Sequence, residues 1–204
     1  MNGQIIFIIT MVCILALIVY LQVKYGLLKD ASTADKKPYS FARTQLVWWT
    51  WIVMSSFVAT VLSGGKVPTL WESTLILLGI GSLTTVAARI TDISDGNIAA
   101  ATENLNYLSR NENGESFIID ILSDKTGVSV HRLQAVLFNF VFGLWFIYEV
   151  WKAIAKVKAD VDQSVIDHVM PLIEPKNLAL LGLSASTYLA LKTQENKDIN
   201  NTHP

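Results

Sequence analysis

Long runs of uncharged, apolar residues constrain this chain more than any other feature of its sequence. Residues 5–23 hold no charged side chain, and further apolar runs begin near residues 46, 70, 133 and 177. A helix of about 20 residues, rising 1.5 Å per residue, crosses the ~30 Å hydrocarbon core of a bilayer. Only 16% of the residues are charged, whereas about a quarter are charged in a typical soluble domain. We therefore predict an integral membrane protein.

The first apolar run, within residues 1–24, is predicted to be an N-terminal transmembrane anchor. The alternative is a signal peptide, which would need a basic start and a small-x-small cleavage site. The start, Met-Asn-Gly-Gln, is uncharged, and the first basic residues, Lys24 and Lys29, follow the run. This order favours an uncleaved anchor with its N-terminus outside.

Two parts of the chain resemble each other. Residues 75–89 (LILLGIGSLTTVAAR) and 178–192 (LALLGLSASTYLALK) share L-x-L-L-G, a Thr five residues after the Gly, and a basic end. Upstream, residues 40–45 (SFARTQ) and 129–134 (SVHRLQ) share S-x-x-R-x-Q, and each opens a long apolar run. The sequence therefore predicts that a two-helix unit occurs twice.

The predicted fold is all-α: a polytopic membrane protein with five transmembrane helices, in which a parallel duplicated helical hairpin follows the anchor helix. The predicted units are the anchor (1–24), a cytoplasmic linker (25–39), a first two-helix membrane unit (40–90), an acidic cytoplasmic segment (91–131), a second two-helix membrane unit with an extended outer connection (132–192) and a polar tail (193–204). Most of the 16 Lys and Arg residues fall in the linker, the acidic segment and the tail. By the positive-inside rule this places the N-terminus outside and the C-terminus in the cytoplasm.

Helical spacing of apolar residues predicts two further features. Valines continue the pattern of the fourth span to Val165, so we expect that helix to extend beyond the bilayer or to bend along it. Residues 117–122 place apolar side chains on one face of a short amphipathic helix, with Asp120 and Asp124 opposite. About 40 residues cannot bury much core alone, so we expect the acidic segment to pack on the bundle, on another subunit or on a partner.

The two S-x-x-R-x-Q segments supply four candidate interface residues: Arg43, Gln45, Arg132 and Gln134. A cation at a helix N-terminus opposes the macrodipole, so something should offset each arginine. One interpretation is an interfacial arginine that snorkels to lipid phosphate and fixes topology. The other is a salt bridge from Arg132 to Asp120 or Asp124 that docks the acidic segment onto the bundle.

Thr50 and Asn139 each lie seven residues after those arginines, on the same helix face and roughly 10 Å deeper. Polar groups inside the membrane usually face the bundle interior and form hydrogen bonds between helices. The alternative is that the two residues line a pore in an oligomer.

Small residues at a spacing of four favour close helix packing in lipid. Gly182, Ser186 and Ala190 have this spacing in the expected fifth span, and Gly79 occupies the position of Gly182 in the first unit. We expect tight packing there, within the chain or between subunits.

The sequence shows no residue pattern that specifies a reaction. It contains no Gly-rich phosphate loop, nucleophile–base set or metal-ligand spacing, and its single cysteine, Cys13, can form no disulfide within the chain. The formal net charge of −1 does not suggest a nucleic-acid partner. We predict a protein that is not an enzyme and has no cofactor, metal site or catalytic residue.

The chain also resembles a little-characterised family of bacterial inner-membrane proteins. In that family S-x-x-R-x-Q leads into an aromatic W-T helix, and G-I-S-x-x-T-Y-L-x-x-K closes the unit. Here Trp49-Thr50 matches the first motif, while Thr187, Tyr188 and Lys192 match the second. The first copy has Thr85 where Tyr is expected, and the second has Phe138-Asn139 for W-T. The resemblance covers roughly residues 40–90 and 117–192 and implies a bacterial inner-membrane location without an activity.

Together these features favour a non-enzymatic membrane module, an anchor or sensor. We expect it to form a homo-oligomer in the bacterial inner membrane and to couple the bilayer to a soluble cytoplasmic protein. The alternative is an oligomeric channel or a membrane-permeabilising effector.

Overall fold

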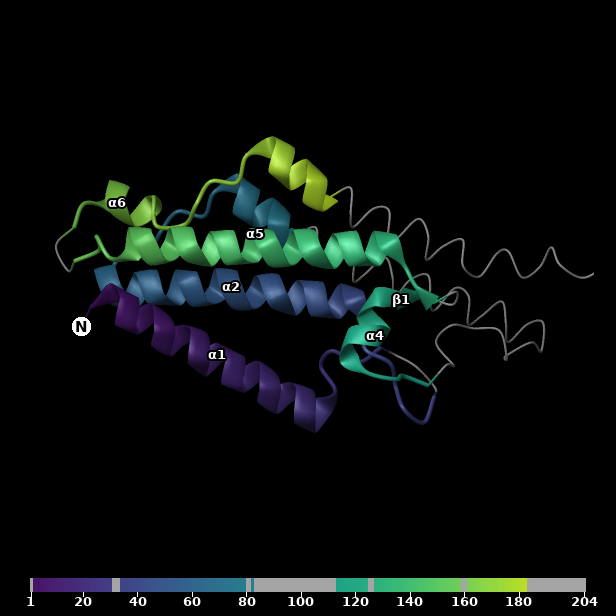
Figure 1. Ribbon diagram of the computed structural model, residues 1–204. Helices are drawn as coiled ribbons and strands as arrows, with labels where there is room; N and C mark the ends of the chain where they lie inside the picture. The colour runs from purple at the N-terminus through teal and green to yellow at the C-terminus, as the bar shows by residue number, and fades with distance from the viewer. Residues whose placement is uncertain are drawn as a thin grey trace, which may run out of the picture.

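Three long helices dominate the computed structural model of the chain (Figure 1). They are α1 (Gly3–Tyr25), α2 (Phe41–Gly64) and α5 (Val130–Ile154). Each is long and apolar enough to cross a membrane. The structure describes residues 2–30, 34–79, 82, 113–124, 127–158 and 161–182. Within these ranges the chain is mostly helical and has three candidate membrane-spanning helices.

The expected third and fifth spans are described only in part. Residues 72–79 and 175–182 are helical. The remainder of both expected spans, most of the acidic segment and the tail 193–204 lie outside the described residues. Five spans and the duplicated hairpin therefore stay predictions.

The ends of the long helices follow from local sequence. Asn2 accepts a hydrogen bond from the Gln4 backbone N–H (3.2 Å) at the start of α1. Gly26 and Gly65 end α1 and α2 with φ of 65°, the left-handed conformation that glycine adopts most readily. Ser40 and Ser129 occupy the N-cap positions of α2 and α5, but neither side chain makes a cap hydrogen bond. The first two-helix unit, predicted to begin at residue 40, thus begins with Ser40 as the N-cap of α2.

Helix α2 lies between α1 and α5 and contacts both (Figure 1). It runs in the same direction as α5 and opposite to α1, as the residue colours show. We compare the fraction of buried residues in the most apolar part of each helix. This fraction is 39% for α2, 17% for α1 and 28% for α5. The central position of α2 accounts for this difference, because two of its faces are covered.

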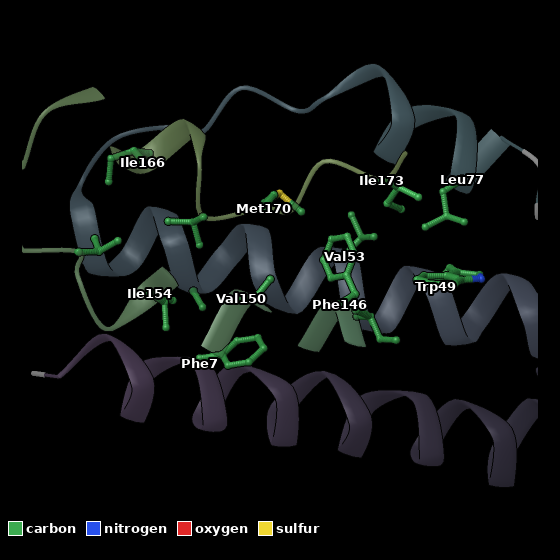
Figure 2. Packing of buried hydrophobic residues seen from close by; sticks show 14 of the residues in the cluster. Phe7, Trp49, Val53, Leu77, Phe146, Val150, Ile154, Ile166, Met170 and Ile173 are labelled. Atoms are coloured by element: carbon green, nitrogen blue, oxygen red, sulfur yellow. The ribbon is translucent and has the colours of Figure 1, made fainter. Parts of the chain in front are cut away.

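One apolar core joins the long helices to the segments that pack over them (Figure 2). Phe7 of α1, Trp49 of α2 and Phe146 of α5 are each at most 1% exposed. Ile166 and Leu77 add side chains from outside the three long helices. The segments after α2 and after α5 therefore belong to the same packed unit.

The outward faces of α1 and α5 are strongly apolar. Large side chains that are 38–83% exposed include Ile5, Ile8, Ile9, Val12, Leu15, Leu17, Val19 and Val23 on α1, and Leu133, Leu137, Phe138, Phe140, Val141 and Leu144 on α5. An apolar surface of this extent is unfavourable in water and is typical of helices that contact lipid.

The fourth span was expected to extend beyond the bilayer or to bend along it, and its helix does not continue to Val165. Helix α5 ends at Ile154, and a turn follows at residues 155–156. The short helix α6 (Gln163–Asp167) then packs back, with Ile166 fully buried in the core. The valine spacing that suggested a longer helix reflects burial of Val157 and Val161 against this core.

The described end of the acidic segment contains α4 (Phe117–Leu122), β1 (Ser123–Asp124) and β2 (Gly127–Val128). The strands pair antiparallel, with Ser123 opposite Val128 and Asp124 opposite Gly127. The short helix was predicted, and the strand pair was not. The helix buries Ile121, whereas Ile118 is 65% exposed.

The contact between α2 and α5 requires a glycine at position 143. A Cβ atom there would lie 2.5–2.7 Å from the Trp48 indole, which is closer than real Cβ contacts. A Cβ atom at Gly79 would meet nothing within 4 Å among the described residues. The tight packing expected at Gly79 stays a prediction, since most of the expected third and fifth spans lies outside the described residues.

We expect Gly143→Ala to lower the free energy of unfolding by about 1–3 kcal/mol, because the added methyl overpacks the α2–α5 contact. Gly79→Ala is the matched control and should be neutral or stabilise by about 0.5–1 kcal/mol, since alanine favours helix. Thermal unfolding of the two variants in the same detergent measures both effects. Equal melting temperatures would contradict the close approach.

Candidate functional site

The main polar contact between α2 and α5 joins two tryptophans to one asparagine. Trp49 Nε1 donates to Asn139 Oδ1 (2.6 Å), and Trp48 Nε1 donates to the Asn139 backbone oxygen (3.0 Å). The Asn139 amide nitrogen donates to the Ala135 oxygen (2.7 Å). Trp49 and Asn139 are 1% and 6% exposed. Both ends of the Asn139 amide thus have partners inside the subunit.

Thr50 and Asn139 do not lie together in the subunit. Asn139 is buried in the α2–α5 contact, whereas Thr50 is exposed on α2. The next residue, Trp51, donates its indole N–H to the Met11 oxygen of α1 (2.9 Å). The sequence predicted that Thr50 and Asn139 lie at the same depth in the membrane. In the structure Asn139 faces a neighbouring helix, whereas Thr50 faces outward.

A polar cap covers one end of α2 and α5. We use this name for the described residues 26–30, 34–40, 113–124 and 127–129. Gly114 N donates to Lys36 O (2.7 Å), Lys36 Nζ donates to Glu115 O (2.7 Å), and Lys36 N donates to Asn113 Oδ1 (3.1 Å). The linker and the acidic segment, nearly 80 positions apart in sequence, therefore form one structure.

Asp120 is the centre of this cap. Its two carboxylate oxygens accept backbone N–H bonds from Tyr39 (3.0 Å) and Glu115 (2.8 Å). The Tyr39 ring makes an edge contact with Phe117, with 5.2 Å between ring centroids. Gly114 must be a glycine because a Cβ there would lie 2.7 Å from Pro38 Cα. These contacts attach the end of the acidic segment to the start of α2.

Arg43 and Arg132, the equivalent arginines of the two S-x-x-R-x-Q segments, have different surroundings. Arg132 donates from Nη1 to the Ser123 oxygen, which ties the start of α5 to β1. Arg43 is half-buried at the start of α2. The side chain of Asp124, the other predicted partner of Arg132, lies outside the described residues. Arg132 thus contacts the acidic segment through at least one backbone carbonyl, and the predicted salt bridge to Asp120 or Asp124 stays a prediction.

The equivalent glutamines of the two segments, Gln45 and Gln134, also differ in their exposure. Gln45 is 4% exposed, and its Oε1 atom has no hydrogen-bond partner in the described part of the chain, while Gln134 is exposed. Of the predicted small-residue face, Gly182 is half-buried at the end of the described helix, and Ser186 and Ala190 lie outside the described residues.

The opposite end of the bundle holds a second polar network that the sequence did not reveal. Gln163 Nε2 donates to Val67 O (2.9 Å), Thr69 N donates to Asp167 Oδ1 (2.8 Å), and Trp71 Nε1 donates to Met170 O (3.1 Å). The Thr69 backbone N–H, and after it the Gln163 amide, lower the pKa of the Asp167 carboxyl. These bonds join the turn after α2 to the region around α6.

Among the described residues, no three or more His, Cys, Asp or Glu side chains are grouped so that they could hold a metal ion. Cys13 is a free thiol on the exposed face of α1. The polar cap and the second polar network are built mainly from side-chain hydrogen bonds to backbone atoms. Such bonds hold segments of the chain in place relative to one another.

We expect Asn139→Leu to destabilise the protein by about 1–3 kcal/mol, because the buried Trp49 indole N–H loses its acceptor. In a double-mutant cycle, Asn139→Leu and Trp49→Phe should couple by about 1 kcal/mol. Trp51→Phe is the control, since Trp51 donates to Met11 instead, and its effect should add to that of Asn139→Leu. Additivity in both cycles, measured by unfolding in detergent, would contradict the assigned contact.

We expect Asp120→Ala to open the polar cap while the three long helices remain. Amide exchange at Tyr39 and Glu115 should accelerate about tenfold or more, since hydrogen bonds to a charged acceptor are strong. Asp35→Ala changes an exposed acid of the same linker and should leave both amides protected. Hydrogen exchange read by mass spectrometry makes the comparison, and unchanged protection in Asp120→Ala would disprove the central role of Asp120.

Comparisons with known proteins give no match to any family model, curated protein or solved structure. The resemblance to the bacterial inner-membrane family therefore stays a prediction from its motifs. Function has to be inferred from the geometry of the polar cap, the second polar network and the three helices.

Proposed function

We propose that this chain is a non-enzymatic membrane module, an anchor or sensor, that couples the inner membrane of a bacterium to a soluble cytoplasmic protein. The observation that carries the proposal is the polar cap. A folded polar structure at one end of three apolar helices offers a surface that a soluble protein can bind. In this proposal the chain has five spans, a duplicated hairpin, an outer N-terminus and a cytoplasmic C-terminus.

The cap has the properties of a connection between membrane and partner. It continues through Ser40 into α2 and is bonded to α5 through Arg132, so a displacement of the cap acts on both helices directly. Phe117, Ile118 and Ile119 are 40%, 65% and 42% exposed. Exposed apolar residues among polar ones are typical of sites where proteins bind.

Basic residues support a cytoplasmic position for the cap. Lys24, Lys29, Lys36, Lys37, Arg43 and Arg132 all lie in or beside it. Lys and Arg are enriched on the cytoplasmic side of membrane proteins. The predicted homo-oligomer would bring several caps onto one face of the membrane.

The channel remains the alternative, and one observation favours it. Thr50 is an exposed hydroxyl-bearing residue within a candidate span, so it can face a neighbouring subunit or a pore. Asn139 counts against the channel as first predicted, because its amide is bonded inside the subunit. A pore lined by both residues would need α2 and α5 to rotate apart.

We expect Ile118→Ser to abolish co-purification of a stoichiometric soluble protein, because Ile118 is the most exposed apolar residue of α4. Val67→Ser is the matched control: Val67 is 64% exposed, but it lies in the turn after α2, at the other end of the bundle. The complexes would be purified in mild detergent, and their intact mass and composition read together.

Retention of the same partner by Ile118→Ser would contradict the assigned surface. A wild-type complex made of this chain alone would contradict coupling to a soluble protein and favour the channel. Ion flux through reconstituted vesicles, with Thr50→Val as the test variant, would then be the decisive measurement.

A further inference from the structure

A pocket of about 370 Å³ lies where the end of α5 meets α6. Ala153 and Lys156 line it from α5 and the turn that follows, and Ser164, Val165 and His168 line it from α6 and its C-cap. The pocket is open to the surface, since Lys156, Ser164 and His168 are exposed, and its volume falls within the roughly 300–1,000 Å³ of small-molecule sites. Nothing in the polar cap takes part in it.

The walls of this pocket are held in place by the core and the second polar network. Ile166 of α6 is fully buried in the core, beside Gly64 at the end of α2 (Figure 2). Gln163 and Asp167 bond to the turn after α2 through Val67 O and Thr69 N. A pocket with fixed walls can bind a ligand without first ordering itself.

The polar groups in the pocket suit a phosphodiester with a hydroxyl-bearing headgroup. Lys156 is exposed, and no acceptor for its ammonium is present among the described residues. The His168 Nδ1 atom lies 2.5 Å from Ser164 O. A carbonyl only accepts, so Nδ1 carries the hydrogen and Nε2 can accept a hydrogen bond from a ligand hydroxyl.

The His168 ring is also fixed in orientation. Its edge contact with Trp71, at 5.8 Å between ring centroids, adds to the bond from Nδ1. The fixed His168 acceptor lies beside a Lys156 ammonium that has no acceptor among the described residues, so the pocket offers two polar contacts of different kinds. Most of the remaining lining, from Ala153 and Val165, is apolar.

The position of the pocket along α5 favours a lipid as the ligand. The 25 residues of α5 span about 37 Å at 1.5 Å per residue, which exceeds the ~30 Å hydrocarbon core. Lys156 follows the end of this helix, so its ammonium lies at the depth of lipid phosphates if α5 crosses the bilayer.

We propose that the pocket between α5 and α6 binds the headgroup of an anionic phospholipid of the phosphatidylglycerol type, with Lys156 contacting the phosphodiester and His168 accepting from a headgroup hydroxyl. The site is independent of the function proposed for the polar cap, which lies at the other end of the helices.

The test measures lipid binding by native mass spectrometry of the full chain in detergent. Delipidated protein is titrated with phosphatidylglycerol or phosphatidylcholine of identical acyl chains. We expect the wild type to prefer phosphatidylglycerol and Lys156→Gln to weaken that binding about tenfold, since a charge-assisted contact is lost. Lys152→Gln is the matched control: Lys152 lies one turn earlier and pairs with Glu149 (3.3 Å), so its loss should leave binding unchanged.

A second variant separates a pocket from general attraction between charges. Ala153→Phe keeps every charge and fills the space, so it should also reduce phosphatidylglycerol binding. Equal binding of the two lipids, or equal effects of Lys156→Gln and Lys152→Gln, would overturn the proposal. So would displacement of the lipid by an equimolar amount of inorganic phosphate, which would show that the pocket takes the free anion.

Discussion

The packing of α2 against its two neighbours is the constraint on which the rest of the structure depends. Within lipid, hydrophobic attraction between helices is absent, so close packing and hydrogen bonds between helices must hold them together. Gly143 lets the Trp48 indole approach α5, and the Trp49–Asn139 bond joins the two helices at a buried point. On the other side of α2, Trp51 donates to Met11 of α1. The contacts on two faces of α2 thus hold all three long helices together.

Indole donors suit this task because one ring supplies both a large apolar surface and a single N–H. A backbone carbonyl in a helix can accept a second hydrogen bond, so Met11 O and Asn139 O serve as acceptors without breaking their helices. Such a contact needs no second polar side chain in the membrane. This kind of contact explains how α1 binds α2 although most of its exposed side chains are apolar.

The sequence predicted the position of each long helix but not the neighbours of their side chains. Apolar length and the S-x-x-R-x-Q pattern placed the two units at residues 40 and 132, close to the starts of α2 at Phe41 and α5 at Val130, because these are local properties. The pattern also suggested equivalent roles for Gln45 and Gln134, yet one is buried and the other exposed. Burial depends on which element packs alongside, and here α2 is central while α5 is not.

The polar cap was the least predictable part, for a physical reason. Its bonds run mostly from N–H groups to backbone or carboxylate oxygens of a segment distant in sequence, as between Gly114 and Lys36. A backbone N–H is present whatever the side chain, so the sequence does not reveal which backbone groups form these bonds. Only Asp120 and the glycine at position 114 could have indicated the cap. The cap and the α6 network lie at opposite ends of the same rigid layer. A ligand that orders one end can therefore affect the other only through α2 and α5, which move as a pair because the buried Trp49–Asn139 contact resists movement of one helix against the other.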